Sequence, residues 1–322
     1  MFCPNTNYFC IMKLILLLLI SIICLNASAQ KTETYYDYNW KPSSVEDARF
    51  YSEVIKTDSG WLRNDYFLGT RTLQMSGLYE DPNSNIANGY FRFYYPNGIP
   101  ESFGRNVHNK KEGLWIHYHP NGFMEDSTFY VNGNPSGTSF GWYSNGYLAD
   151  SIVYNNDGTA VEVDWYTNGS PSAAGRLKND TLNGPWLFFH NNGKVAARES
   201  YEMGVLKSAE YYDESGKQED KPESDREATF PGGKGGWNNY VNKRLYFPPG
   251  YQLVNGDMVT VVVVATIDEE GNVVNPYVKV PFNKTFDYVA LSVFRKCPKW
   301  LPAISHNRAH TETISQPVTF SN

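Results

Sequence analysis

The sequence carries a tandem repeat with a period of 23 or 24 residues. Five of its six turn glycines follow an asparagine, and Asn-Gly is a strong signal for a tight reversal between two strands. A fixed period of this length is typical of one supersecondary unit that is copied and stacked, because no single copy can bury its apolar face alone. The repeat glycines are Gly98, Gly122, Gly146, Gly169, Gly193 and Gly216.

Each unit contains a second turn signal about half a period after the first, as at Asn132-Gly133 and Asn179-Asp180. Two strands and two reversals per unit predict an antiparallel meander. Alternating residues at 73–79 extend the predicted sheet back to about residue 50. We therefore expect a mainly β repeat sheet over residues 86–216, preceded by a β segment within residues 30–85.

An aromatic residue stands four positions before every repeat glycine. Aromatic rings suit a pleated, half-buried surface, so we expect these residues to form a stripe across the sheet. The rings could pack on one another and hold the repeats together, or they could form a recognition surface for sugar rings or an apolar strand. The stripe consists of Tyr94, Tyr118, Trp142, Trp165, Phe189 and Tyr212.

The units resemble the MORN-like repeats of the bacterial YwqK antitoxin-type family. The clearest copies are residues 113–122 and 184–193, and the similarity covers roughly residues 86–216. Copies three and four depart from it, because Ser139 and Glu162 stand where the clearest copies carry tryptophan. The resemblance implies the repeat fold and no particular activity.

The first 29 residues have the pattern of a secretory signal peptide. Lys13 precedes an apolar run at 14–25, and Ala27-Ser28-Ala29 supplies the small residues of a cleavage site. The run is shorter than the roughly 20 apolar residues that span a bilayer. We expect export to the periplasm or cell envelope after cleavage at Ala29, with lipid attachment at Cys24 as the alternative.

Cysteine usage and charge exclude several classes of protein. Cleavage leaves Cys297 alone, so the mature chain forms neither an intramolecular disulfide nor a cysteine metal cluster. Loss of Lys13 takes the net charge from -6 to -7, which disfavours nucleic-acid binding. A metal site at His117 and His119 is conceivable, but polar repeat surface explains these residues equally well. We predict no catalytic residues, no cofactor and no metal, and hence no enzyme.

Residues 217–227 are charged and polar and predict a linker. The pattern beyond them predicts a helix at about 236–245, a strand hairpin at 258–267 and 273–280, a helix at 286–296 capped by Thr285, and a last strand at 311–320. The first of these strands and the second helix should face each other. The residues expected to meet there are Val261, Val263, Ala265 and Ile267 on the strand and Phe286, Val289, Ala290, Val293 and Phe294 on the helix.

Residues 228–322 resemble the C-terminal domain of TonB, in the form expected of a Bacteroidota-type envelope protein. The resemblance implies a small α+β domain that engages an extended segment of an outer-membrane transporter by adding it to the open edge of its sheet. It also implies contact residues on the last strand, where Pro317 lacks an amide hydrogen and favours an edge position. The motifs are Phe230-Pro231-Gly232-Gly233, Phe247-Pro248, the hairpin with Asp268 and Gly271, Pro298-Lys299-Trp300 with Pro302, and Pro317-Val318-Thr319-Phe320; the implied contact residues are Thr313, Ser315, Pro317 and Phe320.

Two features differ from an energy-transducing TonB: the N-terminus is expected to be cleaved, and a repeat sheet replaces the Pro-rich spacer. A soluble or loosely attached adaptor is therefore the preferred interpretation. Two functions follow as hypotheses. The first is a cell-envelope module that binds partner proteins by strand addition. The alternative is a glycan- or lipid-binding repeat protein whose aromatic face is the functional site.

Overall fold

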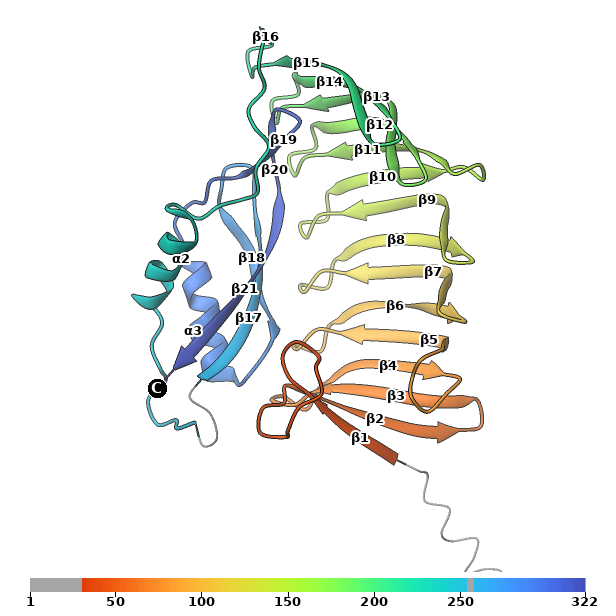
Figure 1. The fold of residues 1–322 in the computed structure, drawn as a ribbon, viewed down its shortest axis with the longest axis vertical. Helices are drawn as coiled ribbons and strands as arrows, with labels where there is room; N and C mark the ends of the chain where they lie inside the picture. The colour runs from red at the N-terminus through yellow and green to blue at the C-terminus, as the bar shows by residue number, and fades with distance from the viewer. Residues whose placement is uncertain (1–30, 254–257, 322) are drawn as a thin grey trace, which may run out of the picture.

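The computed structural model describes residues 31–253 and 258–321, and the predicted signal peptide lies outside them. Within the described residues, a 16-stranded antiparallel sheet runs as a simple meander beside a small α+β C-terminal unit (Figure 1). The predicted repeat sheet is confirmed. It begins before the expected residue 50, because its first strand starts at Lys31. Its strands are β1 (Lys31–Tyr36), β2 (Phe50–Thr57), β3 (Gly60–Phe67), β4 (Leu73–Tyr79), β5 (Ala87–Tyr94), β6 (Pro100–Val107), β7 (Lys110–Tyr118), β8 (Met124–Val131), β9 (Asn134–Trp142), β10 (Leu148–Tyr154), β11 (Thr159–Trp165), β12 (Pro171–Lys178), β13 (Thr181–Phe189), β14 (Val195–Glu202), β15 (Val205–Tyr212) and β16 (Gln218–Glu219).

The Asn-Gly turns reverse the chain as expected, through a type I turn in place of the two-residue hairpin turn that Asn-Gly often forms. The Gly98 N–H donates to the Tyr95 carbonyl at 2.8 Å, and only the glycine takes a positive φ, of 83°. This arrangement is a type I reversal followed by a bulge, in which glycine supplies the left-handed position. At the other ends of the strands, Asn179 and Asp180 both take positive φ, which is typical of the two-residue hairpin turn.

Four of the five turn asparagines use both ends of the amide. The Oδ1 atom of Asn121 accepts from the Phe123 N–H at 3.1 Å and closes its own turn. Its Nδ2 atom donates to the Ser144 carbonyl at 2.7 Å, in the turn of the next repeat. Asn97, Asn168 and Asn192 repeat the pattern. The asparagine therefore ties neighbouring repeats together as well as shaping the reversal.

A second column of bonds joins the repeats at the position three residues before each glycine. A tyrosine or histidine there reaches the main-chain carbonyl of the stripe residue one repeat later, at 2.6 to 2.8 Å. These bonds lie beyond the strand ladder and add stability between neighbours. The five residues are Tyr95, His119, Tyr143, Tyr166 and His190.

Two tryptophans lie flat on the sheet, where the facing strand has a glycine. A Cβ atom at Gly104 would lie 2.1 Å from the Trp115 ring, and one at Gly175 would lie 2.1 Å from the Trp186 ring. Each indole N–H donates to a main-chain carbonyl, and the side chains are only 4% and 3% exposed. The single-layer sheet thus buries these two large side chains against its own backbone.

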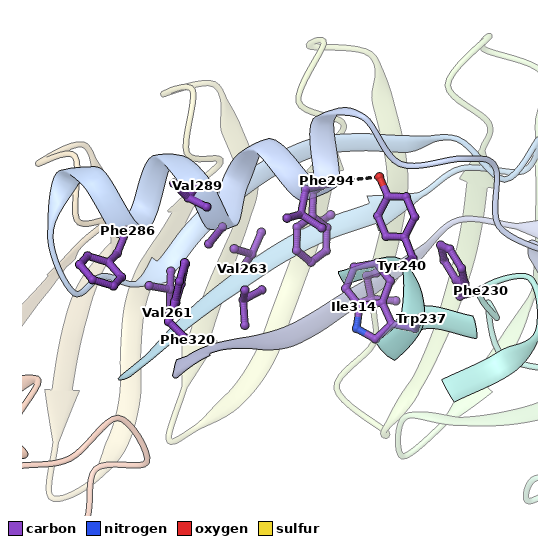
Figure 2. Packing of buried hydrophobic residues seen from close by; sticks show 14 of the residues in the cluster. Phe230, Trp237, Tyr240, Val261, Val263, Phe286, Val289, Phe294, Ile314 and Phe320 are labelled. Atoms are coloured by element: carbon purple, nitrogen blue, oxygen red, sulfur yellow. Dashed lines mark hydrogen bonds between the residues drawn. The ribbon is translucent and has the colours of Figure 1, made fainter. Parts of the chain in front are cut away.

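The C-terminal unit has a conventional core. A three-stranded sheet of order β18-β17-β21 is covered on one face by two helices, and the Tyr240 hydroxyl donates to the Val293 carbonyl at 3.0 Å to join these helices (Figure 2). All nine residues predicted to meet between strand and helix are buried. The elements are α2 (Gly233–Asn242), β17 (Met258–Ile267), β18 (Val273–Val280), α3 (Lys284–Arg295), β19 (Ala303–Ser305), β20 (Arg308–His310) and β21 (Glu312–Ser321).

Three sequence expectations about this region were wrong in detail. The cap of α3 is Asn283, whose extended backbone lets its side chain accept from the N–H groups of Thr285 and Phe286. Helix α2 begins at Gly233, three residues before the predicted start at about residue 236. Residues 218–219 of the expected linker form β16, because they pair with β15 and continue the meander. None of the described helices is long and apolar enough to cross a membrane.

The two units contact each other at both ends of the meander. Near its start, Val280 packs with Phe50 and Phe67 in a small buried cluster. Near its end, the β19–β20 hairpin, here called the docking hairpin, reaches the last repeats through His306. Between these points, the Asn275 amide donates to the Ser144 hydroxyl at 2.7 Å.

Candidate protein-binding edge and neighbouring sites

Strand β21 is an edge strand of the C-terminal sheet. All ten of its residues are in register with β17, from Glu312 opposite Ile267 to Ser321 opposite Met258. On its other side, no strand pairs with it and no backbone hydrogen bond reaches it from any residue that the structure describes. An edge of this kind presents a row of unpaired donors and acceptors to another chain.

The side chains of β21 alternate between core and exterior. Ile314 and Val318 are buried, whereas Thr313, Ser315 and Pro317 are exposed. The expectation that the Phe320 side chain contacts a partner was wrong. Its ring lies in the core, 1% exposed and 4.9 Å from the Phe286 ring, because it falls on the helix-facing register of the strand.

The register of Pro317 indicates which residues present their backbone to the open side. In an antiparallel ladder, both the N–H and the C=O of a residue point to the same neighbour, and successive residues alternate. Proline is tolerated in a sheet where its nitrogen faces away from the ladder. Thr313, Ser315 and Thr319 share the register of Pro317, so we expect their main-chain groups to point outward.

The segment that follows the repeats does not pair with β21. Arg226 and Thr229 form main-chain bridges with Ile304 and Leu301, not with β21. The Ala228 N–H donates to the carboxylate of Glu312, at the first residue of the strand. The chain's own linker is therefore anchored beside β21 without completing the sheet.

A groove of about 1290 Å³ separates the repeat turns from the C-terminal sheet. Carboxylates of Glu125, Asp126 and Asp150 line it, together with aromatic rings that include Trp142 of the stripe. Burial raises the pKa of Glu125 and of Asp150. Water in the groove therefore screens these acids incompletely.

An acidic pair, Glu162 and Asp164, lies in copy four of the repeat and is coupled to Asp150 of this groove. Burial, and then repulsion from Glu162 and Asp150, raises the pKa of Asp164 to about 7. Glu162 shares a hydrogen bond with Asp164, and burial raises its pKa as well. Glu162 is one of the two departures from the repeat pattern, so this position carries a charge where the clearest copies carry tryptophan.

The docking hairpin meets the repeats through one ion pair and several ring contacts. The His306 ring stacks on Phe188 with centroids 3.7 Å apart, and its Nδ1 lies 2.8 Å from the Glu199 carboxylate. Burial alone would raise the pKa of Glu199, but hydrogen bonds from His306 and Tyr201 hold it below its usual value. The guanidinium of Arg308, 8% exposed, lies over the Tyr166 ring.

The two histidines considered for a metal site have separate partners. His117 Nδ1 lies 2.8 Å from Asp126 Oδ1, and His119 Nε2 lies 2.7 Å from the Trp142 carbonyl. Among residues 31–253 and 258–321, no group of three or more His, Cys, Asp or Glu side chains could hold a metal ion.

The aromatic stripe is half-buried at all six positions. It lies on the sheet face opposite Trp115, since Trp115 stacks with His117 whereas Tyr118 stacks with Phe103. We call the Trp115 side the inner face and the stripe side the outer face. Exposed apolar side chains of the outer face include Leu114 and Phe140.

Comparison with known proteins supports the repeat assignment. A family model described as a MORN repeat variant matches residues 182–203, and no TonB domain model matches. The matched residues hold most of β13 and all of β14, so the repeats are MORN-like. No curated protein matches the chain.

Among solved structures, the chain is similar to one described as the crystal structure of accessory secretory protein 1, 2 and 3 in Streptococcus pneumoniae. The identity is 11% and the TM-score 0.15, over 42% of this chain and 21% of that one. The matched region thus spans about a fifth of the length of that structure's chain.

Proposed function

We propose that this protein is a cell-envelope interaction module that binds extended segments of outer-membrane transporters, or of related partners, by adding them as a strand to β21. The observation that carries the proposal is the open side of β21, whose other side is fully paired with β17. The resemblance of residues 228–322 to the TonB C-terminal domain and the predicted leader support the partner class and the compartment.

The physical basis is the order already present in β21. Its helix-facing side chains, Ile314, Val318 and Phe320, fix the strand in the core. Because β21 is already ordered, only the incoming segment would lose conformational entropy on binding, and this preorganisation favours association. Main-chain hydrogen bonds supply affinity in this mode, and alternate side chains supply selectivity.

The repeat sheet has a supporting role in this proposal. It contacts the C-terminal unit at Val280 and at His306, near opposite ends of the meander. This double attachment would hold the β21 edge in a fixed orientation on an exported adaptor. Transmission of force from a membrane motor is not part of the proposal.

Strand addition can be tested with an array of peptides from the N-terminal periplasmic segments of outer-membrane transporters, probed with the full-length protein. Thr313→Pro removes a main-chain donor that we expect to face outward, and should weaken peptide binding about tenfold, the equivalent of one or two hydrogen bonds. Thr313→Ala is the matched control, because it removes the same side chain and keeps the N–H.

Unchanged affinity in a folded Thr313→Pro protein would contradict strand addition at this edge. Circular dichroism would establish that both variants are folded. An array on which no peptide binds the wild-type protein would also count against the proposal.

A second candidate function is binding of a glycan or lipid surface by the repeats. The observation that favours it is the exposed ring of Phe140 on the outer face, 6.0 Å from that of Trp142. Trp115 and Trp186 do not suit this role, since both are buried against the sheet. A glycan array would decide: Phe140→Ala should abolish a stacking signal that the inner-face substitution Tyr130→Ala leaves intact.

A further inference from the structure

A pocket of about 410 Å³ adjoins the middle of β21. Gln316 and Pro317 form its strand wall, and α2 forms the opposite wall through Lys234 and Asn238. We call this space the β21 pocket. Its volume falls within the range of about 300–1,000 Å³ that binding pockets occupy, so it can admit a large side chain.

The floor of the β21 pocket is aromatic and rigid. Phe230, Trp237 and Trp300 line it, and their ring centroids lie 5.4 or 5.5 Å apart. All three are only 6% or 7% exposed, and Trp237 also packs on Phe294 in the core. Trp237, Phe230 and Ile314 of β21 belong to one buried cluster, part of which Figure 2 shows. These rings offer apolar contact without needing to be ordered on binding.

The rim of the β21 pocket is polar. Lys234 and Asn238 are both exposed and lie one helical turn apart on α2. Within the described residues, Lys234 forms no salt bridge of the kind seen at Lys207. A carboxylate on a bound segment would therefore find a free ammonium group at the rim.

We propose that the β21 pocket receives one large apolar side chain, flanked by an acidic residue, from the segment that adds to β21. This inference rests on the proposed function and names the class of segment. Side chains of an added strand point alternately to the two faces of the sheet, so one that lies opposite Gln316 on the helix side enters the pocket.

The β21 pocket also solves a problem of register. A polar edge specifies pairing weakly, and a segment could slip along it by two residues without losing main-chain bonds. Pro317 offers no N–H, so the ladder is interrupted beside the pocket. A side chain seated there offsets the missing bond and fixes one alignment.

The test uses the full-length protein and a peptide that binds it on the transporter array. An alanine scan of that peptide should show one apolar position at which affinity falls tenfold or more. Asn238→Trp should fill the β21 pocket and weaken the parent peptide about tenfold, while affecting the alanine-substituted peptide far less. Asn239→Trp is the matched control, because Asn239 is exposed on the same helix and does not line the pocket.

The outcomes separate the two proposals. If Thr313→Pro abolishes binding but Asn238→Trp does not change it, or if the alanine scan is flat, strand addition stands and the pocket inference is wrong. If Thr313→Pro has no effect, the proposed function itself is wrong. Reversal of charge in Lys234→Glu should weaken peptides with an acidic residue next to the apolar position; unchanged affinity would remove the acidic residue from the inference.

Discussion

The repeat sheet and the C-terminal unit solve the problem of burying apolar surface in opposite ways. The C-terminal unit encloses side chains such as Val261 and Phe286, fully buried, between a sheet and two helices. The repeat sheet is a single layer in which Trp186 lies flat over Gly175, and its indole N–H donates to the Arg176 carbonyl of the neighbouring strand. Contacts in the first are shared among distant segments, whereas contacts in the second join near neighbours.

This difference implies different responses to damage. A shared core loses stability as a whole when one member is removed. A stack of repeats behaves as a sum of units and nearest-neighbour interfaces, so damage stays local. The following substitutions probe that contrast, beginning with the largest expected effect.

Phe286→Ala should unfold the C-terminal unit while the repeats stay folded. The ring contacts four other rings at 4.9 to 5.2 Å and is fully buried, so its loss should cost about 3–5 kcal/mol. Thermal denaturation followed by circular dichroism should show the two transitions separate. Tyr288→Ala, 64% exposed on the same helix, should change little. A parallel shift of both transitions would show that the units unfold as one.

Gly175→Ala should destabilise one repeat by about 1–3 kcal/mol, because the new methyl group overlaps the Trp186 ring. Hydrogen exchange should rise in β12, β13 and β14 and stay unchanged in β5 and β6. Gly235→Ala has open space at its Cβ and should be neutral or slightly stabilising. Faster exchange along the whole meander would contradict the nearest-neighbour description.

Asp164→Asn should stabilise the protein at high pH. The pKa of about 7 in the fold exceeds the usual aspartate pKa of 3.8, so the folded state binds more protons between these pH values and loses stability as the pH rises. The amide removes that penalty, for a gain of about 1–2 kcal/mol at pH 8 that disappears near pH 4. Melting temperatures at pH 4, 6 and 8 would test this. A difference in melting temperature between variant and wild type that stays constant with pH would show that the fold does not raise the pKa of Asp164.

Tyr143→Phe should have the smallest effect. It deletes one bond to the Trp165 carbonyl, 2.7 Å long, worth about 1 kcal/mol. Urea denaturation would measure the loss, with Tyr147→Phe, 59% exposed, as the control. Equal stability of the two variants would show that the Tyr143 hydrogen bond adds nothing to the strand ladder that joins the repeats.

The sequence predicted those parts of the fold that depend on local pattern. The glycine period fixed the meander, and alternation in 258–267 identified its buried face. The same alternation in Ile314, Val318 and Phe320 would have placed Phe320 in the core. The column of Tyr95, His119 and their equivalents was also visible, one position after the aromatic stripe.

Contacts between distant segments could not be predicted in this way. His306 stacks on Phe188, 118 positions earlier in the chain, and neither residue carries a local signal for the other. The docking hairpin was missed because its strands have only three residues each, too short for a recognisable pattern. The β21 pocket combines α2, β21 and Trp300, so it exists only once these segments are assembled.

Because the C-terminal unit is attached near both ends of the meander, its length restricts the number of repeats that can lie between the two attachment points. A tandem array can lengthen or shorten by recombination of whole copies without harm to its internal contacts. Here an extra copy would move His306 away from Phe188 or Val280 away from Phe50. Duplication of a repeat, which is harmless in a free solenoid, would therefore cost this protein one of its two attachments. We expect the number of repeats to be constant among its descendants.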